Sequence, residues 1–374
     1  MDVRSTPDQQ RRSCPIRVKI MEDIPFAWGE PERRAAEGDV ASVRELGARL
    51  ADGYEDATRR ARTYQEQLAR VVRVLALTPG RESLVELMRL VDEKRLPSHP
   101  RELASLLAEH QRPADLAAAV FRRPGAGTPY ELEACLFQEL LLRGVDMHGF
   151  PPPPASHPLS WLPGRLRDFE SGAEFPRRSV NGSAYGIGTE MPTEGRVDPP
   201  VPRAAERSAL RNSVTAEVHE AIIAAPESGE WGNADAWVFQ PDEALAPEQV
   251  PALLPTLPMP CTDVGPTGRF EVARTPLGDV WRPLFASASI GGIYGGGVCG
   301  AWGRMWAWRS MAGLAGAAPG ADAEEVERLA RATTWFRFEA DSGWFHNEVG
   351  ADFGIAALSP DHRRLAVLTA TDTD

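Results

Sequence analysis

Three residues in the last third of the chain are of the types that carry out nucleophilic catalysis: Cys299, His346 and Asp361. Cys299 lies in a glycine-rich stretch, residues 290–308, and directly precedes a predicted helix. The dipole and the N–H groups at a helix N-terminus lower the pKa of a thiol placed there. These residues therefore make Cys299 a candidate nucleophile, His346 its general base and Asp361 the residue that orients the base.

The order of these residues along the chain resembles that of papain-like and transglutaminase-like enzymes. The resemblance implies a cysteine-dependent acyl transferase or hydrolase. The segment VCGAW lacks the second cysteine that papain-like enzymes have directly before the tryptophan, and HNEV lacks the tryptophan that often follows the histidine in transglutaminase-like chains. A cysteine buried for structural reasons is the competing interpretation of Cys299, and a more common one.

The glycine-rich stretch also contains Gly295-x-Gly297-x-x-Gly300 ahead of the predicted helix, which is the local pattern of a dinucleotide-binding turn. The acidic residue that should follow on a second strand is missing at the required distance, and too few residues remain for a dinucleotide-binding sheet. The sequence therefore predicts no bound cofactor.

Four polar residues around the histidine suit a divalent cation: Asp341, His346, Glu348 and Asp352. Their spacing matches no established pattern of metal ligands, and charged residues in loops usually face water. We therefore expect no metal site.

The tryptophans of the stretch favour a packing role. Trp302, Trp306 and Trp308 place large rings on a helix, and the glycines before them permit close contact between a helix and a sheet. We expect the stretch to be the packed centre of a C-terminal domain. It is uncharged from residue 284 to 303, but its seven glycines make it a poor membrane span, so no membrane association is predicted.

The positions of turn-forming residues and the hydrophobic periodicity predict an α+β chain in three parts. Residues 1–148 form a helical domain, residues 149–202 a Pro/Gly-rich linker or irregular surface, and residues 203–374 an α+β domain. In the last part a helix is predicted from about Ala209, followed by strands that end in a closing β-hairpin around SPDHRR.

Composition restricts the partners and the compartment. The net charge of −12 argues against nucleic acid, whose binding requires clustered Lys and Arg. Cys14, Cys135, Cys261 and Cys299 form no CxxC pair and are expected to be reduced thiols. The first residues contain no apolar core of a signal peptide, so a cytoplasmic location is expected.

Two N-terminal segments, residues 35–53 and 128–148, resemble fragments of ankyrin repeats, but they do not recur at that repeat's period. They suggest a surface for a protein partner, with a plain helical domain as the alternative. The stretch TPLGDVWRPLFASASIGGIYGGGVCGAWGRMWAWRSMAGL and the ending WFHNEVGADFGIAALSPDHRRLAVLTATDTD resemble an uncharacterised actinobacterial family of unknown function. The sequence favours a non-enzymatic partner-binding or accessory protein over the cysteine-dependent enzyme.

Overall fold

The computed structural model describes residues 29–56, 61–94, 99–121, 130–173, 175, 177–179, 182–184, 190–200, 208–265, 268–292, 295–345 and 351–372. The chain divides into two compact units, Met1–Ser98 and His99–Asp374. Its helices and its antiparallel sheet confirm the predicted α+β class. The predicted domain boundaries at residues 148 and 202 stay a prediction.

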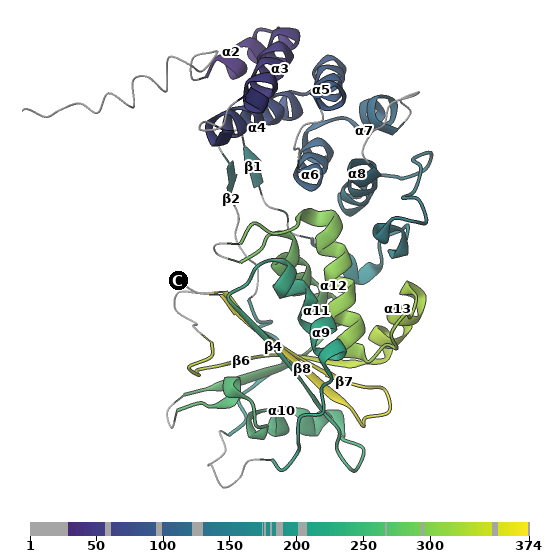
Figure 1. Ribbon diagram of the computed structural model, residues 1–374. Helices are drawn as coiled ribbons and strands as arrows, with labels where there is room; N and C mark the ends of the chain where they lie inside the picture. The colour runs from purple at the N-terminus through teal and green to yellow at the C-terminus, as the bar shows by residue number, and fades with distance from the viewer. Residues whose placement is uncertain are drawn as a thin grey trace, which may run out of the picture. The chain divides into compact units, whose positions relative to one another are not determined.

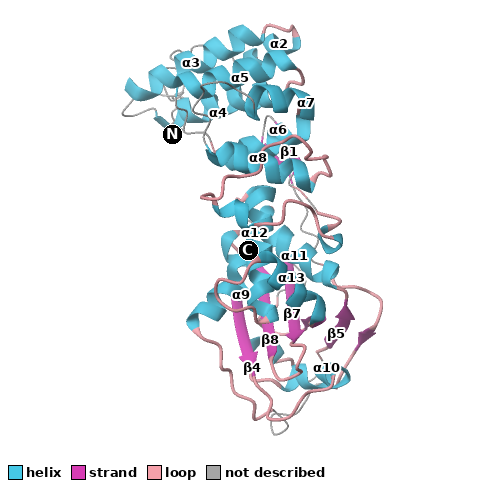
Figure 2. Ribbon diagram, turned by 90° about the vertical axis from the view of Figure 1, so that its right-hand side faces the viewer, coloured by secondary structure: helices cyan, strands magenta, loops and turns pink. Residues whose placement is uncertain are grey.

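The described part of the first unit is helical, as Figure 2 shows in cyan. Hydrophobic positions three and four residues apart give each of the longer helices one buried face, on which Leu68, Val71 and Leu75 of α4 lie. The helices are α2 (Glu30–Ala36), α3 (Val40–Asp56), α4 (Ala61–Leu77) and α5 (Arg81–Lys94).

The second unit begins with further helices and contains the sheet. Its helices are α6 (Pro100–His110), α7 (Pro113–Leu116), α8 (Tyr130–Leu142), α9 (Ala216–Ser228), α10 (Val250–Leu253), α11 (Leu277–Ser289), α12 (Cys299–Ala315) and α13 (Ala323–Ala332). Between α8 and α9 lie short turns of 3-10 helix and a small ribbon of β1 (Arg177–Ser179) and β2 (Gly182–Ala184).

The sheet has six described strands in the order β3-β5-β6-β7-β8-β4, and every neighbouring pair is antiparallel. The strands are β3 (Arg196–Val197), β4 (Asn233–Phe239), β5 (Phe270–Thr275), β6 (Thr334–Ala340), β7 (Ala351–Leu358) and β8 (Leu365–Asp372). The predicted closing hairpin is confirmed, because β7 and β8 pair from Leu358 and Leu365 at the turn to Ala351 and Asp372.

Both faces of the sheet are covered. Figure 1 shows α9, α11 and α12 on one face and α10 on the other. The face beneath α10 is built from large apolar side chains of alternating strand positions, such as Phe336 and Phe338 of β6 with Leu365 and Val367 of β8. Alternation places these residues on one side of each strand, so the two faces have separate cores.

Two expectations for this unit are corrected. The helix predicted from Ala209 begins only at Ala216, where the hydroxyl of Thr215 accepts a hydrogen bond from the N–H of Val218. The residues before it lie along the end of β4 instead, with the side chain of Asn212 accepting a bond from the N–H of Val238. Strand β4 itself was not predicted, because it begins with Asn, Ala and Asp, which are residues of low strand propensity.

Candidate functional site

Helix α12 is the structural centre of the second unit, and it begins where the sequence predicts. It packs against α9, α11 and the sheet (Figure 1), and both Trp308 and Met311 are fully buried. A Cβ atom on Gly303 would lie 2.6 Å from the Cβ of Ser289 at the end of α11. Glycine is therefore what allows these two helices to approach so closely. The stretch does lie at the packed centre of the second unit, but the close contact that Gly303 allows is with helix α11 and not the predicted one with the sheet.

The loop before α12 is fixed by its own backbone. The N–H of Val298 donates to the carbonyl of Ala288, and Gly291 adopts a φ of 92°, in the left-handed region that favours glycine. A Cβ on Gly291 would lie 2.5 Å from the backbone nitrogen of Gly297. This loop leads from one helix into another, since α11 ends at Ser289.

A dinucleotide-binding turn connects a strand to a helix, so the glycines of this helix-to-helix loop do not form one. The first turn of α12 also already faces a carboxylate: buried Glu139 of α8 accepts a bond of 3.1 Å from the N–H of Ala301. Glu139 in turn pairs with Arg143. A phosphate at this helix end would meet a negative charge rather than unused donors.

Cys299 is the first residue of α12, as predicted, and is buried, with 4% of its surface exposed. Its φ of 64° is a strained value for a residue with a side chain. Cys299 lines a cavity of about 410 Å³ together with His99, Arg101 and Glu102. The candidate nucleophile therefore borders a space in which a small group has room.

Of the other two members of the predicted triad, Asp361 is described, and it is not brought to Cys299. Asp361 lies in the turn between β7 and β8, where it accepts hydrogen bonds from the hydroxyl of Ser359 and the N–H of Arg363. Nearby Arg364 donates to the carbonyls of Gly313 and Leu314 in the last turn of α12. The turn is thus near the far end of a 17-residue helix that begins at Cys299, about 24 Å away. His346 lies outside the described residues.

The four residues weighed as metal ligands, for which the sequence predicts no metal site, are only partly described. Asp341 accepts a bond from the N–H of Arg269 and lies at the protein surface, whereas Asp352 is buried in β7. His346 and Glu348 lie outside the described residues. In the part of the chain that the structure describes, no group of three His, Cys, Asp or Glu side chains is arranged to hold a metal ion.

A hydrogen-bonded cluster around Glu131 joins α6, α8 and α12. Its carboxylate accepts bonds from Trp302 (2.6 Å), His157 (2.9 Å) and Arg101 (3.3 Å). Burial raises the pKa of Glu131, but these hydrogen bonds outweigh burial and hold the pKa below its ordinary value. Because Nδ1 of His157 accepts from the N–H of Leu159, Nε2 carries the proton that is donated to Glu131. Both nitrogens of His157 are thus engaged, which is the arrangement of a structural histidine.

A second polar cluster lies deeper, around Arg304 of α12. Arg304 and Glu170 are fully buried and form a two-bond ion pair of 2.6 and 2.8 Å. The remaining N–H groups of Arg304 donate to the side chain of Gln138 and to the carbonyls of Pro163 and Arg165. Glu170 also accepts from the indole of Trp308. All five N–H donors of the guanidinium are satisfied, so this cluster fixes the segment around Glu170 to α12 and is not available to a ligand.

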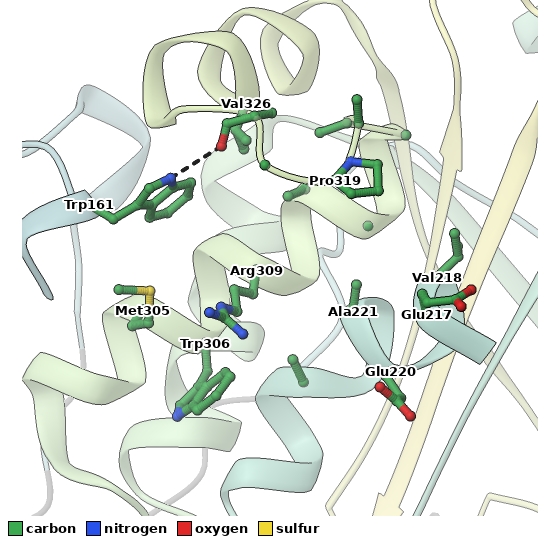
Figure 3. A pocket seen from close by; sticks show the side chains of 18 of the residues that line it. Trp161, Glu217, Val218, Glu220, Ala221, Met305, Trp306, Arg309, Pro319 and Val326 are labelled. Atoms are coloured by element: carbon green, nitrogen blue, oxygen red, sulfur yellow. Dashed lines mark hydrogen bonds between the residues drawn. The ribbon is translucent and has the colours of Figure 1, made fainter. Parts of the chain in front are cut away.

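The exposed face of α12 forms the floor of an open groove of about 1110 Å³, which we call the α12 groove. Trp306, Arg309 and Ala312 line its floor. Figure 3 shows α9 with Glu217, Glu220 and Ala221 on one side, and Trp161, Pro319 and Val326 on the other. Helices α9 and α12 run antiparallel here: the N–H of Ala225 donates to the hydroxyl of Ser310, and one turn further along Gly313 packs against Ile222.

Charge is unevenly distributed across the α12 groove. Its α9 side carries Glu217, Glu220 and Glu227, which lie within about 80° of one another around the helix and span about 15 Å of its length. No salt bridge joins these three carboxylates to any side chain among the described residues. On the floor, the guanidinium of Arg309 lies 5.0 Å from the centre of the Trp306 ring. The sequence reasoning did not single out this groove, because its walls come from segments far apart in the chain.

The fold and this groove define an α+β protein with a solvent-exposed, aromatic and acidic surface site. None of the described helices has the length and hydropathy needed to cross a bilayer.

The chain belongs to a family of unknown function, DUF6183, whose model matches residues 26–374. The match therefore extends over nearly the whole chain, whereas the sequence resemblance predicted it for the C-terminal third. No curated protein and no solved structure matches the chain.

Proposed function

We propose that this chain is a non-enzymatic partner-binding or accessory protein and that the α12 groove is a surface through which it binds. The observation that carries the proposal is the combination of a half-exposed Trp306 and an exposed Arg309 on the floor of a groove of about 1110 Å³. Tryptophan and arginine are the side chains that most often dominate the binding energy of protein interfaces.

The charges of the groove support binding rather than catalysis. Hydrogen bonds from its own backbone N–H and from Thr215 lower the pKa of Glu217, which keeps this carboxylate ionised at neutral pH. A general acid needs a pKa raised toward neutrality. An ionised, solvent-exposed carboxylate is instead suited to steering and pairing with a cationic partner.

Two further expectations belong to this proposal. The helical N-terminal part offers a second surface for a protein partner. A cytoplasmic location is supported by Cys135, Cys261 and Cys299, which are buried and form no disulfide.

The test is affinity isolation with the full chain as bait, in parallel with Trp306→Ala and Val197→Ala. Val197 is 46% exposed and lies on β3, outside the groove, so it controls for the loss of exposed apolar surface. We expect a bound protein that Val197→Ala retains and Trp306→Ala loses. A protein retained by both variants would argue against the groove and for the N-terminal helices, and no bound protein would argue against partner binding altogether.

A second candidate function rests on the strained backbone of Cys299. Non-glycine residues with φ near 60° often occur at functional sites, and this one lines a cavity at a helix N-terminus. The candidate is a cysteine-dependent acyl transferase or hydrolase with Cys299 as nucleophile. Of its proposed partners, His346 is outside the described residues and Asp361 is about the length of α12 away, so another side chain would have to orient the base.

The pH dependence of alkylation, followed by mass spectrometry on the native protein, tests this candidate. Burial raises the pKa of Cys261 to about 12 and also raises that of Cys135, so both thiols serve as unreactive internal controls. A nucleophilic Cys299 reacts faster than both at neutral pH. If Cys299 is as inert as the controls until the protein unfolds, the candidate is wrong.

A further inference from the structure

We infer that the occupant of the α12 groove is an amphipathic α-helix of a partner protein, about three turns long, with Lys or Arg side chains along the side that faces α9. This inference rests on the proposed partner-binding function and adds the chemical class of the partner.

The length of the occupant follows from the floor of the groove. The groove-lining positions of α12 and of the residue that caps it run from Trp306 to Gly316, which is about 15 Å along the helix. The carboxylates of α9 span the same length on the neighbouring wall, from Glu217 to Glu227. A partner helix of three turns lying along α12 reaches all of these positions at once.

The small side chains of the floor favour a helix over bulkier structure. Ala221 of α9 and Ala312 of α12 line the groove between the larger residues and keep part of their surface exposed. Packed helices normally lie 8–10 Å apart, and small residues at the contact allow the shorter of these distances. Trp306 then supplies the large apolar contact into which Leu or Ala side chains of the partner pack.

The charges on the α9 side of the groove select a cationic partner, since the two arginines of the groove lie elsewhere: Arg309 lies over the Trp306 ring, and Arg364 donates to two carbonyls of α12. Glu217, Glu220 and Glu227 form no salt bridge with any described residue and lie on one side of α9, so an incoming helix with basic residues on one side finds three partners. A phosphorylated peptide, a nucleic acid or an anionic membrane would be repelled by the same carboxylates. A second copy of this chain is disfavoured too, because each copy carries a net charge of −12.

Binding of fluorescein-labelled model peptides to the full chain, measured by fluorescence anisotropy, tests the inference. The probes are a 17-residue amphipathic helix of Leu, Ala and Lys, the same peptide with Glu in place of Lys, and the Lys peptide with a central proline that breaks its helix. We expect the Lys peptide to bind at least about tenfold more tightly than the other two.

Two triple variants locate the binding. Glu217→Gln/Glu220→Gln/Glu227→Gln removes the carboxylates of the groove, and Glu190→Gln/Glu194→Gln/Glu243→Gln removes three exposed carboxylates elsewhere in the same unit. Both change the net charge equally, so only the position of the charge differs. We expect the groove triple to weaken the Lys peptide about tenfold and the control triple less than twofold. Trp306→Ala, checked for folding by thermal unfolding, should weaken the peptide as well.

Three outcomes would overturn the inference. Equal losses in the two triples would mean that the peptide follows net charge alone, and tighter binding of the Glu peptide would mean that Arg309 selects an anionic partner. Absence of binding by the Lys peptide would also contradict a basic helix as the occupant. In each case the affinity isolation with Trp306→Ala still decides separately whether the groove binds a partner.

Discussion

Arg304 and Arg309 lie five residues apart on α12 and have opposite environments. Arg304 is fully buried, and each of its N–H groups donates to an acceptor of the protein. Arg309 is exposed in the α12 groove, where it lies over the ring of Trp306. The polar groups on one side of the helix therefore bond within the fold, while those on the other side are exposed to solvent.

The same contrast holds for the carboxylates around α12. Glu170, Glu139 and Glu131 are each engaged by hydrogen bonds from α12 and its neighbours. The carboxylates on the α9 side of the groove form no salt bridge within the described residues. Buried charges whose hydrogen bonds are all satisfied specify the fold. The exposed carboxylates beside Trp306, which have no ion partner among the described residues, are instead the ones that the proposed function assigns to binding.

The largest effect is expected from Arg304→Met. Removing one partner of a buried ion pair leaves the Glu170 carboxylate buried without its cation, which typically costs about 3–5 kcal/mol in the free energy of unfolding. Chemical denaturation of the variant and the parent measures the difference. The double variant Arg304→Met/Glu170→Met should lose less than the sum of the two single variants. Additive losses would show that the two residues are not coupled.

A smaller, pH-dependent effect is expected from Glu131→Gln. Because the pKa of Glu131 is lower in the folded chain than its ordinary value of 4.5, its ionised form stabilises the fold above that pH, and the contribution is lost as the pH falls through the lowered value. We expect the variant to be less stable by about 1–2 kcal/mol at pH 7 and the difference to shrink as the pH falls below 4.5. Unfolding curves of the variant and the parent, at pH 7 and at a pH below 4.5, measure this difference in stability, with Glu243→Gln at an exposed position as the control. A difference independent of pH would contradict this role for Glu131.

The smallest effect on stability is expected from the triple replacement of the groove carboxylates by glutamine. These side chains are exposed and lack ion partners in the described chain, and the hydrogen bonds that lower the pKa of Glu217 act at an exposed helix N-terminus, so the Tm should fall by no more than a few degrees. Differential scanning calorimetry of this triple and the control triple checks it. A marked fall in Tm for the groove triple alone would mean that these carboxylates serve the fold and would remove the contrast between the two sides of α12.

Local sequence patterns predicted much of the second unit. Short, mainly apolar runs in β6 to β8, bounded by turn-forming residues, and the polar turn at Asp361 identified the strands and the closing hairpin, and the start of α12 at Cys299 was also found. Helix α9 was predicted seven residues too early because Asn212 and Ser213, which pair with the end of β4, carry no local signal against a helix. Such tertiary hydrogen bonds override local propensity.

The sites were harder to predict than the elements. Glu170 and Arg304 are 134 residues apart in the sequence, and nothing near either residue indicates that they form an ion pair. The α12 groove likewise depends on α9 and α12 packing side by side. In the sequence alone, its three carboxylates cannot be told apart from other solvent-exposed charges. The position of Cys299 at the start of α12 could be predicted from its neighbours, because the glycines and the helix start are adjacent to it.

The close packing around α12 has a consequence for the evolution of the family. Gly291, Gly297 and Gly303 are spaced six residues apart, and a side chain at any of them would overlap backbone or tightly packed neighbours. The groove residues face solvent, and under the proposed partner-binding function they are free to diverge. We expect distant relatives to keep the three glycines at this spacing even where the groove has lost its carboxylates. The spacing would then identify the fold from sequence, and the composition of the groove would divide the family members by the partner that they are proposed to bind.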